Sequence, residues 1–293
     1  MCSLMMTNST MSRNYQTDLK LAKNALENAD AILIGGGAGL SASAGLRYSG
    51  KRFEDNFTEY IEKYNLTDMY SSGFYPFKTQ EEKWGYWSRH IQINRFEPAT
   101  GDVYLNLKNL VQNKEHHVIT TNVDGQFYKA GFDSSVVFAV QGDYGKIQCA
   151  ISCHSKLYDS EQLVRQMIEE QENCKIPSKL VPHCPVCGEN MEVNIRKDNN
   201  FIEDESWHTS ALSYQQFLSG ISTKKLVLLE IGVGYNTPSL IKFPFEQITS
   251  NHRNTTLIRI NRDHPQASRE NNDKTIVFKE DAAEVIKDIV CVI

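Results

Sequence analysis

The stretch AILIGGGAGLSA, residues 31–42, places four apolar residues before a run of glycines and small residues. A short strand that turns through glycines into a helix lets the backbone approach a pyrophosphate, and the first N–H groups of the helix can bind the anion. The segment GAGLSA fits the dinucleotide-binding pattern G-x-G-x-x-G/A only in its alanine form. The stretch therefore predicts a phosphate-binding turn over residues 35–45, and the alternative is a tight strand-to-helix turn without a ligand.

Apolar periodicity predicts further elements on both sides of this turn. The predicted helices cover residues 18–29, 53–69, 74–96, 102–111, 240–250 and 282–290, and another starts at residue 126. The predicted strands cover residues 31–34, 117–121, 136–140, 226–231 and 256–260. Strands that alternate with helices indicate an α/β fold with a Rossmann-like, doubly wound parallel sheet. The aromatic side chains of residues 74–87 would either cover the site or, as is more common, form core.

Residues 146–200 differ from this pattern, because they contain two cysteine pairs, three prolines and little apolar periodicity. We interpret them as a small inserted module of the zinc-ribbon type. The Rossmann-like domain would then consist of residues 15–145 and 205–293. We expect the first dozen residues to be disordered.

Composition and charge limit the classes of function. The chain has 293 residues, 40% of them hydrophobic, and a formal net charge of −5. Such a chain can bury a large core, but it lacks the basic excess of a general nucleic-acid binder. Its apolar runs are too short to span a bilayer, and its N-terminus has no signal-peptide pattern. We expect a cytoplasmic protein that binds neither nucleic acid nor membranes.

Three other loops follow directly on predicted strands, namely Asn122–Asp124, Gln141–Gly142 and Gly232–Pro238. Ligands of open α/β sheets bind at the carboxyl ends of strands, so we expect these loops and the glycine turn to line one crevice. The Asn122 amide and the Asp124 carboxylate can together hold a carboxamide, which needs both a donor and an acceptor. Each loop taken singly is also explained by turn chemistry, since Asn, Asp and Gly favour turns.

These motifs, in this order, resemble those of sirtuins. Residues 37–41 resemble the G-A-G-x-S opening of that family, and residues 121–124 resemble its T-x-N-x-D segment. Gly232–Gly234, Ile260-Asn261 and Asp281-Ala282 resemble later segments of the cofactor site. The resemblance covers roughly residues 20–290. It implies a site for NAD formed by Gly35, Gly36, Gly37, Ala38, Gly39, Ser41, Ala42, Asn122, Asp124, Gln141, Gly232, Val233, Gly234, Asn236, Asn261, Arg262, Asp281 and Ala282.

The chain departs from sirtuin deacylases at two places. Gln141 stands where they have a catalytic histidine, and residues 46–50 (LRYSG) stand where they have the stretch P-D-F-R. An amide takes up no proton near neutral pH, whereas histidine, with a pKa of about 6.5, can act as a base. Gln141 therefore argues against efficient deacylation, but it does not prevent cleavage of the nicotinamide–ribose bond.

Residues 141–145 (QGDYG) and 234–238 (GYNTP) resemble the class M sirtuins of bacteria, which are often encoded beside a macrodomain protein. This resemblance implies protein ADP-ribosylation of a lipoylated carrier related to the glycine-cleavage H protein. It also implies removal of the mark by a macrodomain hydrolase and a link to oxidative stress. Two alternatives remain, a deacylase that works without the histidine and a non-catalytic sensor of NAD or ADP-ribose. A dehydrogenase is less consistent, because Glu59, which has the spacing of a ribose-binding acid, lies in a predicted helix.

We hypothesise that the catalytic residues are Asn122, Gln141 and Asp124. Asn122 would position the nicotinamide end of NAD, and Gln141 would orient the ribose or the acceptor by hydrogen bonds. Asp124 would bind the carboxamide. The alternative for Gln141 is a strand-end residue bonded to backbone.

The two cysteine pairs predict a structural zinc site. In the segment CPVCG, residues 184–188, two residues separate the thiolates and the glycine permits a tight turn. The earlier pair has three residues between its members, which is within the range of zinc ligands. Four thiolates would close a tetrahedron, formed by Cys149, Cys153, Cys184 and Cys187. His154 or His183 could replace one of them, and reduced cysteines without metal are the alternative.

Overall fold

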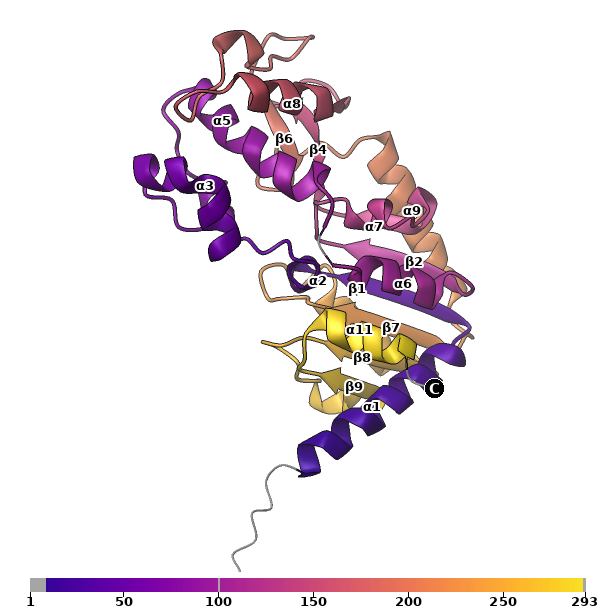
Figure 1. The fold of residues 1–293 in the computed structure, drawn as a ribbon. Helices are drawn as coiled ribbons and strands as arrows, with labels where there is room; N and C mark the ends of the chain where they lie inside the picture. Colours follow the sequence, from indigo (N-terminus) through magenta and orange to yellow (C-terminus); the bar gives the residue numbers. More distant parts are fainter. Residues whose placement is uncertain (1–8, 100, 292–293) are drawn as a thin grey trace, which may run out of the picture.

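The computed structural model describes residues 9–99 and 101–291. Its largest element is a six-stranded sheet with the order β3-β2-β1-β7-β8-β9 (Figure 1). Every neighbouring pair is parallel, which confirms the predicted Rossmann-like sheet. The strands are β1 (Ala31–Gly36), β2 (Glu115–Thr120), β3 (Val137–Ala139), β7 (Leu226–Ile231), β8 (Thr255–Ile260) and β9 (Thr275–Phe278).

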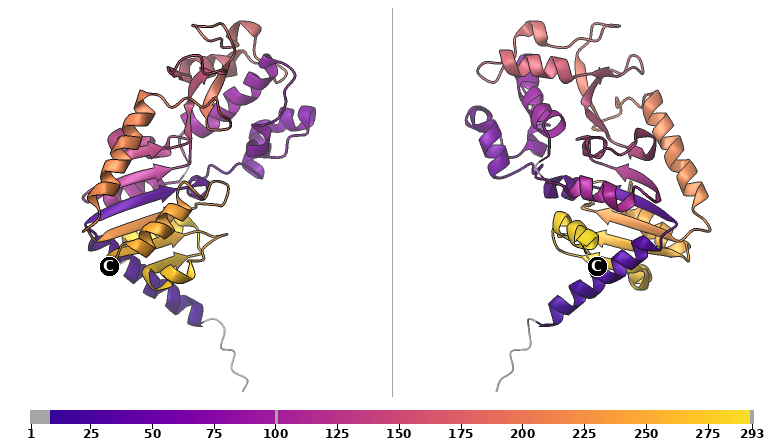
Figure 2. Two further views of the ribbon diagram at one scale, coloured as in Figure 1. Left: turned by 180° about the vertical axis from the view of Figure 1, so that it is seen from behind. Right: turned by 45° about the vertical axis from the view of Figure 1, so that its right-hand side comes forward.

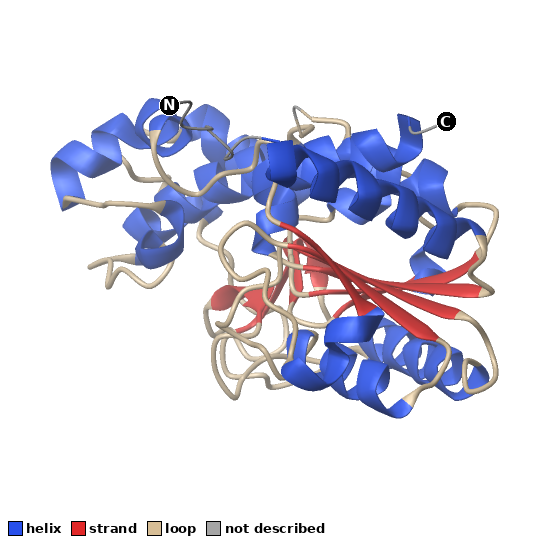
Figure 3. Cartoon of the chain, turned by 90° about the horizontal axis from the view of Figure 1, so that it is seen from below, coloured by secondary structure: helices blue, strands red, loops and turns tan. Residues whose placement is uncertain are grey.

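Helices cover both faces of this sheet, as Figure 3 shows. One face packs against α1 (Ser9–Glu27), α6 (Val103–Val111) and α11 (Ala282–Cys291). The other face packs against α9 (Glu205–Gly220) and α10 (Lys242–Asn251). Both central strands, β1 and β7, are therefore buried along their whole length, which explains their nearly continuous apolar sequences.

The glycine stretch contains less turn than predicted. Strand β1 continues to Gly36, and α2 (Ala38–Ser43) begins directly after Gly37. Gly35 belongs to the strand, where α10 approaches so closely that a Cβ would lie 2.6 Å from Cγ2 of Ile241. Close helix–sheet packing thus explains this glycine without a ligand.

A second, smaller part of the molecule lies beside one end of the large sheet (Figure 2). Its antiparallel sheet joins β4 (Gly142–Cys149) to β5 (Tyr158–Asp159) and β6 (Met191–Ile195). Its helices are α3 (Lys51–Tyr64), α4 (Met69–Ser72), α5 (Gln80–Ile91), the π-helix η1 (Gln92–Phe96) and α8 (Glu161–Glu170). The remaining short elements of the chain are α7 (Gln126–Lys129) and the 3₁₀ turns η2 (Ser134–Val136), η3 (Ser178–Leu180) and η4 (Arg269–Lys274).

Several predicted helix boundaries were wrong. The helix predicted over residues 53–69 ends at Tyr64, where Asn65 takes a left-handed conformation. The helix predicted over residues 74–96 begins only at Gln80, after the capping residue Thr79, and gives way to η1 at residue 92. Residues 146–200, although predicted to lack apolar periodicity, contain the amphipathic helix α8.

The aromatic residues between 75 and 87 belong to the core, as the commoner alternative had it, but Phe74 is exposed. Trp84 and Tyr86 are fully buried, and they pack with α3 aromatics such as Phe57. The same core continues into the cysteine module, so helices from residues 53–93 pack on residues 144–193. The domain boundaries proposed from the sequence remain a prediction.

The predicted disorder of the first dozen residues concerns residues 1–8, which lie outside the described residues, and residues 9–12, which belong to helix α1. Within residues 9–99 and 101–291, no helix is both long and apolar enough to cross a membrane.

Candidate active site

The glycine turn lies where the order of the strands reverses. Strands β1 and β7 are neighbours, but α2 packs on one face of the sheet and α10 on the other. The carboxyl ends of two such strands form a crevice that commonly binds ligands in open α/β folds. The structure therefore brings the first glycine motif beside the Gly232 loop, as predicted.

Direct backbone contact joins these two segments. The Gly39 N–H donates to the Gly232 carbonyl at 2.9 Å. A Cβ on Gly37 would lie 2.6 Å from the Gly232 oxygen, and one on Gly39 would lie 2.7 Å from the Gly232 Cα. Gly232 itself has a φ of 61°, which favours glycine. We call Gly37, Gly39 and Gly232 the glycine wall.

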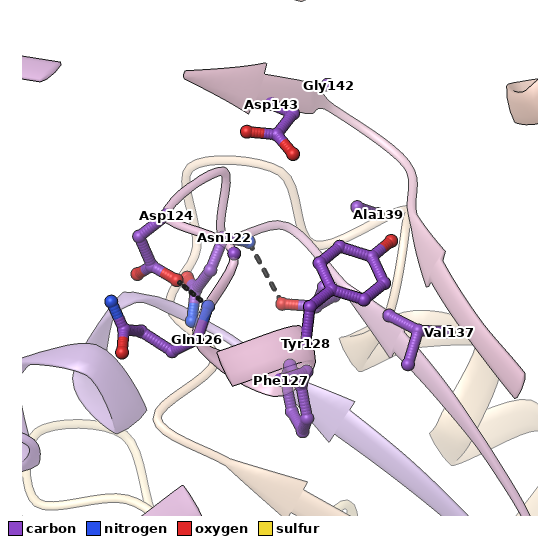
Figure 4. Close-up of a pocket in the computed structure, with 11 residues that line it drawn as sticks. Asn122, Asp124, Gln126, Phe127, Tyr128, Val137, Ala139, Gly142 and Asp143 are labelled. Carbon is purple, nitrogen blue, oxygen red and sulfur yellow. Dashed lines mark hydrogen bonds between the residues drawn. The ribbon is translucent and has the colours of Figure 1, made fainter. Parts of the chain in front are cut away.

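Next to this wall, the loop after β2 is held by side chains. The Ser41 hydroxyl from α2 donates to Oδ2 of Asp124 at 2.5 Å, and it lies 2.8 Å from the Tyr104 hydroxyl of α6. The Gln126 N–H donates to the other carboxylate oxygen at 3.1 Å (Figure 4). Burial raises the pKa of Asp124, while the hydrogen bonds from Ser41 and Gln126 act in the opposite direction.

Asn122 connects this loop to the glycine wall. Its Nδ2 donates to the Gly37 carbonyl at 2.8 Å and to the Tyr104 hydroxyl at 3.3 Å. Its backbone N–H donates to Oγ1 of Thr120, which in turn donates to the Gly36 carbonyl. Two predicted site residues, Asn122 and Asp124, are therefore fixed by hydrogen bonds to the glycine stretch and α2.

Gln141 lies between β3 and β4, next to the same loop. The N–H of Val140 donates to the Thr120 carbonyl, and the N–H of Tyr144 donates to the Val123 carbonyl. The Gln141 carbonyl accepts the Arg196 N–H at 3.0 Å, and its side chain is half-buried. We call Asn122, Asp124 and Gln141, with Ser41 and Tyr104, the side-chain wall.

The hollow in Figure 4 adjoins this wall. It lies between the ends of β2 and β3 and α7. Its lining is formed by Thr120, Asn122, Asp124, Gly125, Gln126, Phe127, Tyr128, Val137, Ala139, Gly142 and Asp143.

The adenosine-side residues implied by the resemblance take different positions. Asn261 is buried, donates to the Val233 carbonyl at 2.8 Å and accepts the N–H of His264. Asp281 accepts the Ala283 N–H at the start of α11, so helix capping is a sufficient role for it. Three of the implied cofactor residues are exposed, namely Gly234, Asn236 and Arg262.

A buried charge network, which the sequence did not reveal, lies next to the Gly232 loop. Glu230 of β7 is fully buried and pairs with Lys242 at 2.8 Å and with Arg259 at 2.8 Å. Arg259 also pairs with Glu246 at 2.7 Å. The Lys242 ammonium lies 5.2 Å from the centre of the Tyr235 ring, so the network reaches the loop itself.

The four paired cysteines come together as predicted. Their sulfur atoms all lie within 4.8 Å of one another. The Cys149–Cys187 and Cys153–Cys184 pairs are each 3.6 Å apart. Bonds of about 2.3 Å to a tetrahedral zinc ion would place sulfurs about 3.8 Å apart, so this cluster fits a four-thiolate metal site. Nε2 of His154 lies 3.4 Å from Sγ of Cys184, beside the cluster.

A model of the Sir2 family matches residues 37–207, which are more than half of the chain. The matched region includes the glycine wall up to residue 39, the side-chain wall and the cysteine cluster. The chain belongs to the Sir2 family.

Two relatives extend the comparison. This Sir2 chain is 38% identical over 268 residues to a protein of Staphylococcus aureus (strain Mu50 / ATCC 700699) named protein ADP-ribosyltransferase, with 91% of this chain and 85% of that protein covered. It is 32% identical over 252 residues to a protein of Fusarium oxysporum f. sp. cubense named probable bifunctional ADP-ribose hydrolase/ADP-ribosyltransferase. The second match covers 82% of this chain and 41% of the longer relative.

The fold is also that of Sir2 proteins. A crystal structure of a complex between a Sir2 homologue and NAD matches with a TM-score of 0.59 and covers 92% of each chain. The two sequences are 18% identical, so this likeness shows the fold alone.

In this Sir2 chain, the segment that replaces P-D-F-R is tied to the segment that carries Gln141. The Tyr48 hydroxyl lies 3.0 Å from the Tyr144 hydroxyl, and the Tyr48 carbonyl accepts the Met69 N–H. Burial raises the pKa of both phenols. The departure at residues 46–50 is thus in contact with Tyr144, three residues after Gln141, which only the folded chain shows.

Proposed function

We propose that the chain is an NAD-dependent protein ADP-ribosyltransferase. In this reaction the bond between the ribose C1′ and the nicotinamide nitrogen breaks, and nicotinamide leaves with the bonding electrons. A nucleophile of the acceptor protein bonds to C1′ and gives up its proton. The observation that carries the proposal is Gln141, which stands at the deacylase histidine's place in a chain 38% identical to a protein named for ADP-ribosyl transfer.

Each residue of the side-chain wall has a role in this proposal. Asn122 positions the nicotinamide end of NAD, and Asp124 receives the carboxamide N–H groups. Both carboxylate oxygens of Asp124 already accept one hydrogen bond, but each oxygen has a second lone pair. Gln141 orients the ribose or the acceptor without taking a proton. The glycine wall and the Asn261 loop hold the rest of NAD.

The proposed acceptor is a lipoylated carrier protein, and a macrodomain hydrolase would remove the mark. The Fusarium relative, which is named for both a hydrolase and a transferase, supports a link between the two activities. We also propose a cytoplasmic location, because the four clustered cysteines form no disulfide, as expected in a reducing compartment.

Three reactions with purified protein and labelled NAD test the activity. The first contains a lipoylated carrier, the second an acyl-peptide and the third no acceptor. We expect label on the carrier in the first, unchanged peptide in the second and slow nicotinamide release in the third. A deacylated peptide with unlabelled carrier would instead make the protein a deacylase, and tight NAD binding without any product would make it a sensor.

We further propose that the cysteine cluster holds a structural zinc ion, since four thiolates leave no open position for catalysis. Metal analysis of the purified protein should give one zinc per chain. Replacement of Cys187 by serine should release the ion and destabilise the second part of the molecule. Zinc well below one per chain in the unaltered protein would contradict the proposal.

A further inference from the structure

Arg95 belongs to the helical part of the molecule but reaches the side-chain wall. It lies in the π-helix η1, whose wider turn directly follows α5. Such turns are rare and often occur at functional sites. The Arg95 guanidinium forms a two-pronged ion pair with Asp143, with Nε 2.6 Å from Oδ1 and Nη2 3.0 Å from Oδ2. Asp143 lies two residues after Gln141.

Two glycines leave room for this guanidinium. A Cβ on Gly125, which directly follows Asp124, would lie 2.5 Å from Cζ of Arg95. A Cβ on Gly145 would lie 3.2 Å from its Nε. Arg95 therefore fits between the loop that carries Asp124 and the strand that follows Gln141, in contact with both.

The Asp143 carboxylate is fixed on both sides. Its Oδ1 also accepts the Gly145 N–H at 2.7 Å, so the start of β4 folds around it. Both side chains of the pair are about one-fifth exposed. Burial works against the charge on Arg95, but the bond to Asp143 outweighs it and the pKa of Arg95 is raised. Forked pairs of arginine and carboxylate add geometric specificity as well as energy.

The pair has geometric consequences for the site. The loop that carries Asp124 and the start of β4, between which Arg95 lies, also touch through a backbone bond from the Tyr144 N–H to the Val123 carbonyl. Together the bond and the ion pair fix where Gln141 stands relative to Asn122 and Asp124. Gln141 comes from a different stretch of chain than Asn122 and Asp124, and a shift of about 1 Å between catalytic groups can cost about a hundredfold in rate.

We propose that the Arg95–Asp143 pair is a positioning device for the transfer reaction, which sets Gln141 at its working distance from the Asn122–Asp124 loop. The inference rests on the proposed function, because it assigns the pair to the transfer step. Arg95 and Asp143 act through the residues they place and need no contact with the reacting atoms.

Substitutions separate this role from a purely structural one. Arg95→Met keeps the volume and removes the charge, Asp143→Asn keeps the shape, and Arg95→Lys keeps one charge but loses the fork. The double variant Arg95→Met/Asp143→Asn tests whether the two act as one unit. The matched control is Arg165→Met, which removes an exposed pair with Glu161 on α8. For each variant, kcat and KM for NAD are measured with the carrier, and so is the release of nicotinamide without it.

We expect Arg95→Met and Asp143→Asn each to lower kcat for transfer about tenfold to a hundredfold, with KM for NAD within about threefold of the original. Arg95→Lys should recover part of the loss, the double variant should be no worse than either single one, and the control should be unchanged. Losses that multiply in the double variant would overturn the proposal, as would an unchanged kcat or a rise in KM alone.

The two proposals fail in distinguishable ways. If the original protein releases nicotinamide but labels no carrier, the proposed function fails, and the pair is then judged on nicotinamide release alone. If the original protein labels the carrier and the Arg95 and Asp143 variants do so equally well, only the positioning role fails.

Discussion

The glycine wall and the side-chain wall are built in different ways. In the glycine wall, backbone meets backbone, and a single added carbon on Gly232 would lie 2.3 Å from the Leu40 nitrogen. In the side-chain wall, polar groups on α2, α6 and the loop after β2 meet through hydrogen bonds of 2.5 to 3.3 Å. Steric fit thus determines one wall, whereas the chemistry of individual side chains determines the other.

Each wall is also braced by charge in its own way. In the network around Glu230, three of the four charged side chains are almost fully buried, Glu246 is about one-fifth exposed, and the four charges cancel. The Arg95–Asp143 pair beside the side-chain wall is partly exposed. We therefore expect changes in the glycine wall to act mainly on folding, and changes in the side-chain wall to act mainly on catalysis. Four predictions test this contrast, from the largest effect to the smallest.

The largest effect is expected for Gly232→Ala. The new Cβ meets backbone, and the φ of 61° strains any other residue, so the free energy of unfolding should fall by more than about 3 kcal/mol. Urea unfolding followed by circular dichroism measures this change. In the same loop, Gly234→Ala meets nothing within 4 Å and should change stability by less than about 0.5 kcal/mol. Equal losses of stability in the two variants would show that steric fit does not determine the structure of this wall.

Asn122→Ala should lower catalysis more than stability. It removes an amide that donates to Gly37 and Tyr104, and we expect kcat for transfer to fall about a hundredfold, which corresponds to about 2.7 kcal/mol. Stability should fall by only about 1 kcal/mol. Steady-state kinetics with the carrier, together with urea unfolding, measure both quantities, and Asn109→Ala on the exposed side of α6 is the control. A kcat within about twofold of the original would count against the catalytic role.

Lys242→Met should lower stability, because it removes one charge of the network next to the Gly232 loop. Glu230 keeps Arg259 as a partner, so the loss of stability should be about 2 kcal/mol, less than for an isolated buried charge. The Tyr235 ring also loses its cation, so NAD should bind more weakly, as calorimetry would show. Lys51→Met, which breaks an exposed pair with Asp55, should change neither quantity. Unchanged stability of Lys242→Met would show that the network does not support the glycine wall.

The smallest effect on stability is expected for Asp124→Asn, which should raise stability where the other three substitutions lower it. Burial raises the pKa of Asp124, so the folded chain holds this proton more tightly than the unfolded chain does. The residue's contribution to stability is therefore largest below the ordinary pKa of aspartate and decreases as pH rises through the raised pKa.

Above that window, Asp124→Asn should be slightly more stable than the original protein, although its transfer activity should fall. Thermal unfolding at a series of pH values measures the difference, with exposed Asp273→Asn as the control. A variant that is less stable at every pH would show that the ionised carboxylate stabilises the fold.

The sequence predicted most of the sheet, because central strands such as Leu226–Ile231 are buried on both faces and read as apolar runs. It did not predict the pairing of β4 with β6, since Gly142 pairs with Ile195 across more than fifty residues. Helix α9 was missed because its partly buried residues, among them Trp207 and Tyr214, are interrupted by polar ones.

The candidate site was predicted in part. Asn122 and Asp124 were found because they follow a strand, and strand ends meet at one edge of a parallel sheet. Tyr104 and Arg95 were missed, because only the packing of α6 and the π-helix turns them toward that loop. The glycines at 35, 37 and 39 were interpreted as a phosphate cradle, and that role remains a prediction, while contacts with α10 and Gly232 show that they are also packing positions.

Gln141→Ala tests whether the side-chain wall determines the chemistry, through its effect on label transfer from NAD to the carrier and on ADP-ribose binding. If the side-chain wall determines the chemistry and the glycine wall holds the cofactor, transfer should fall at least about tenfold, while the dissociation constant stays within about threefold of the original. Unchanged transfer would remove Gln141 from the mechanism. A parallel loss of binding would contradict the division of roles between the two walls.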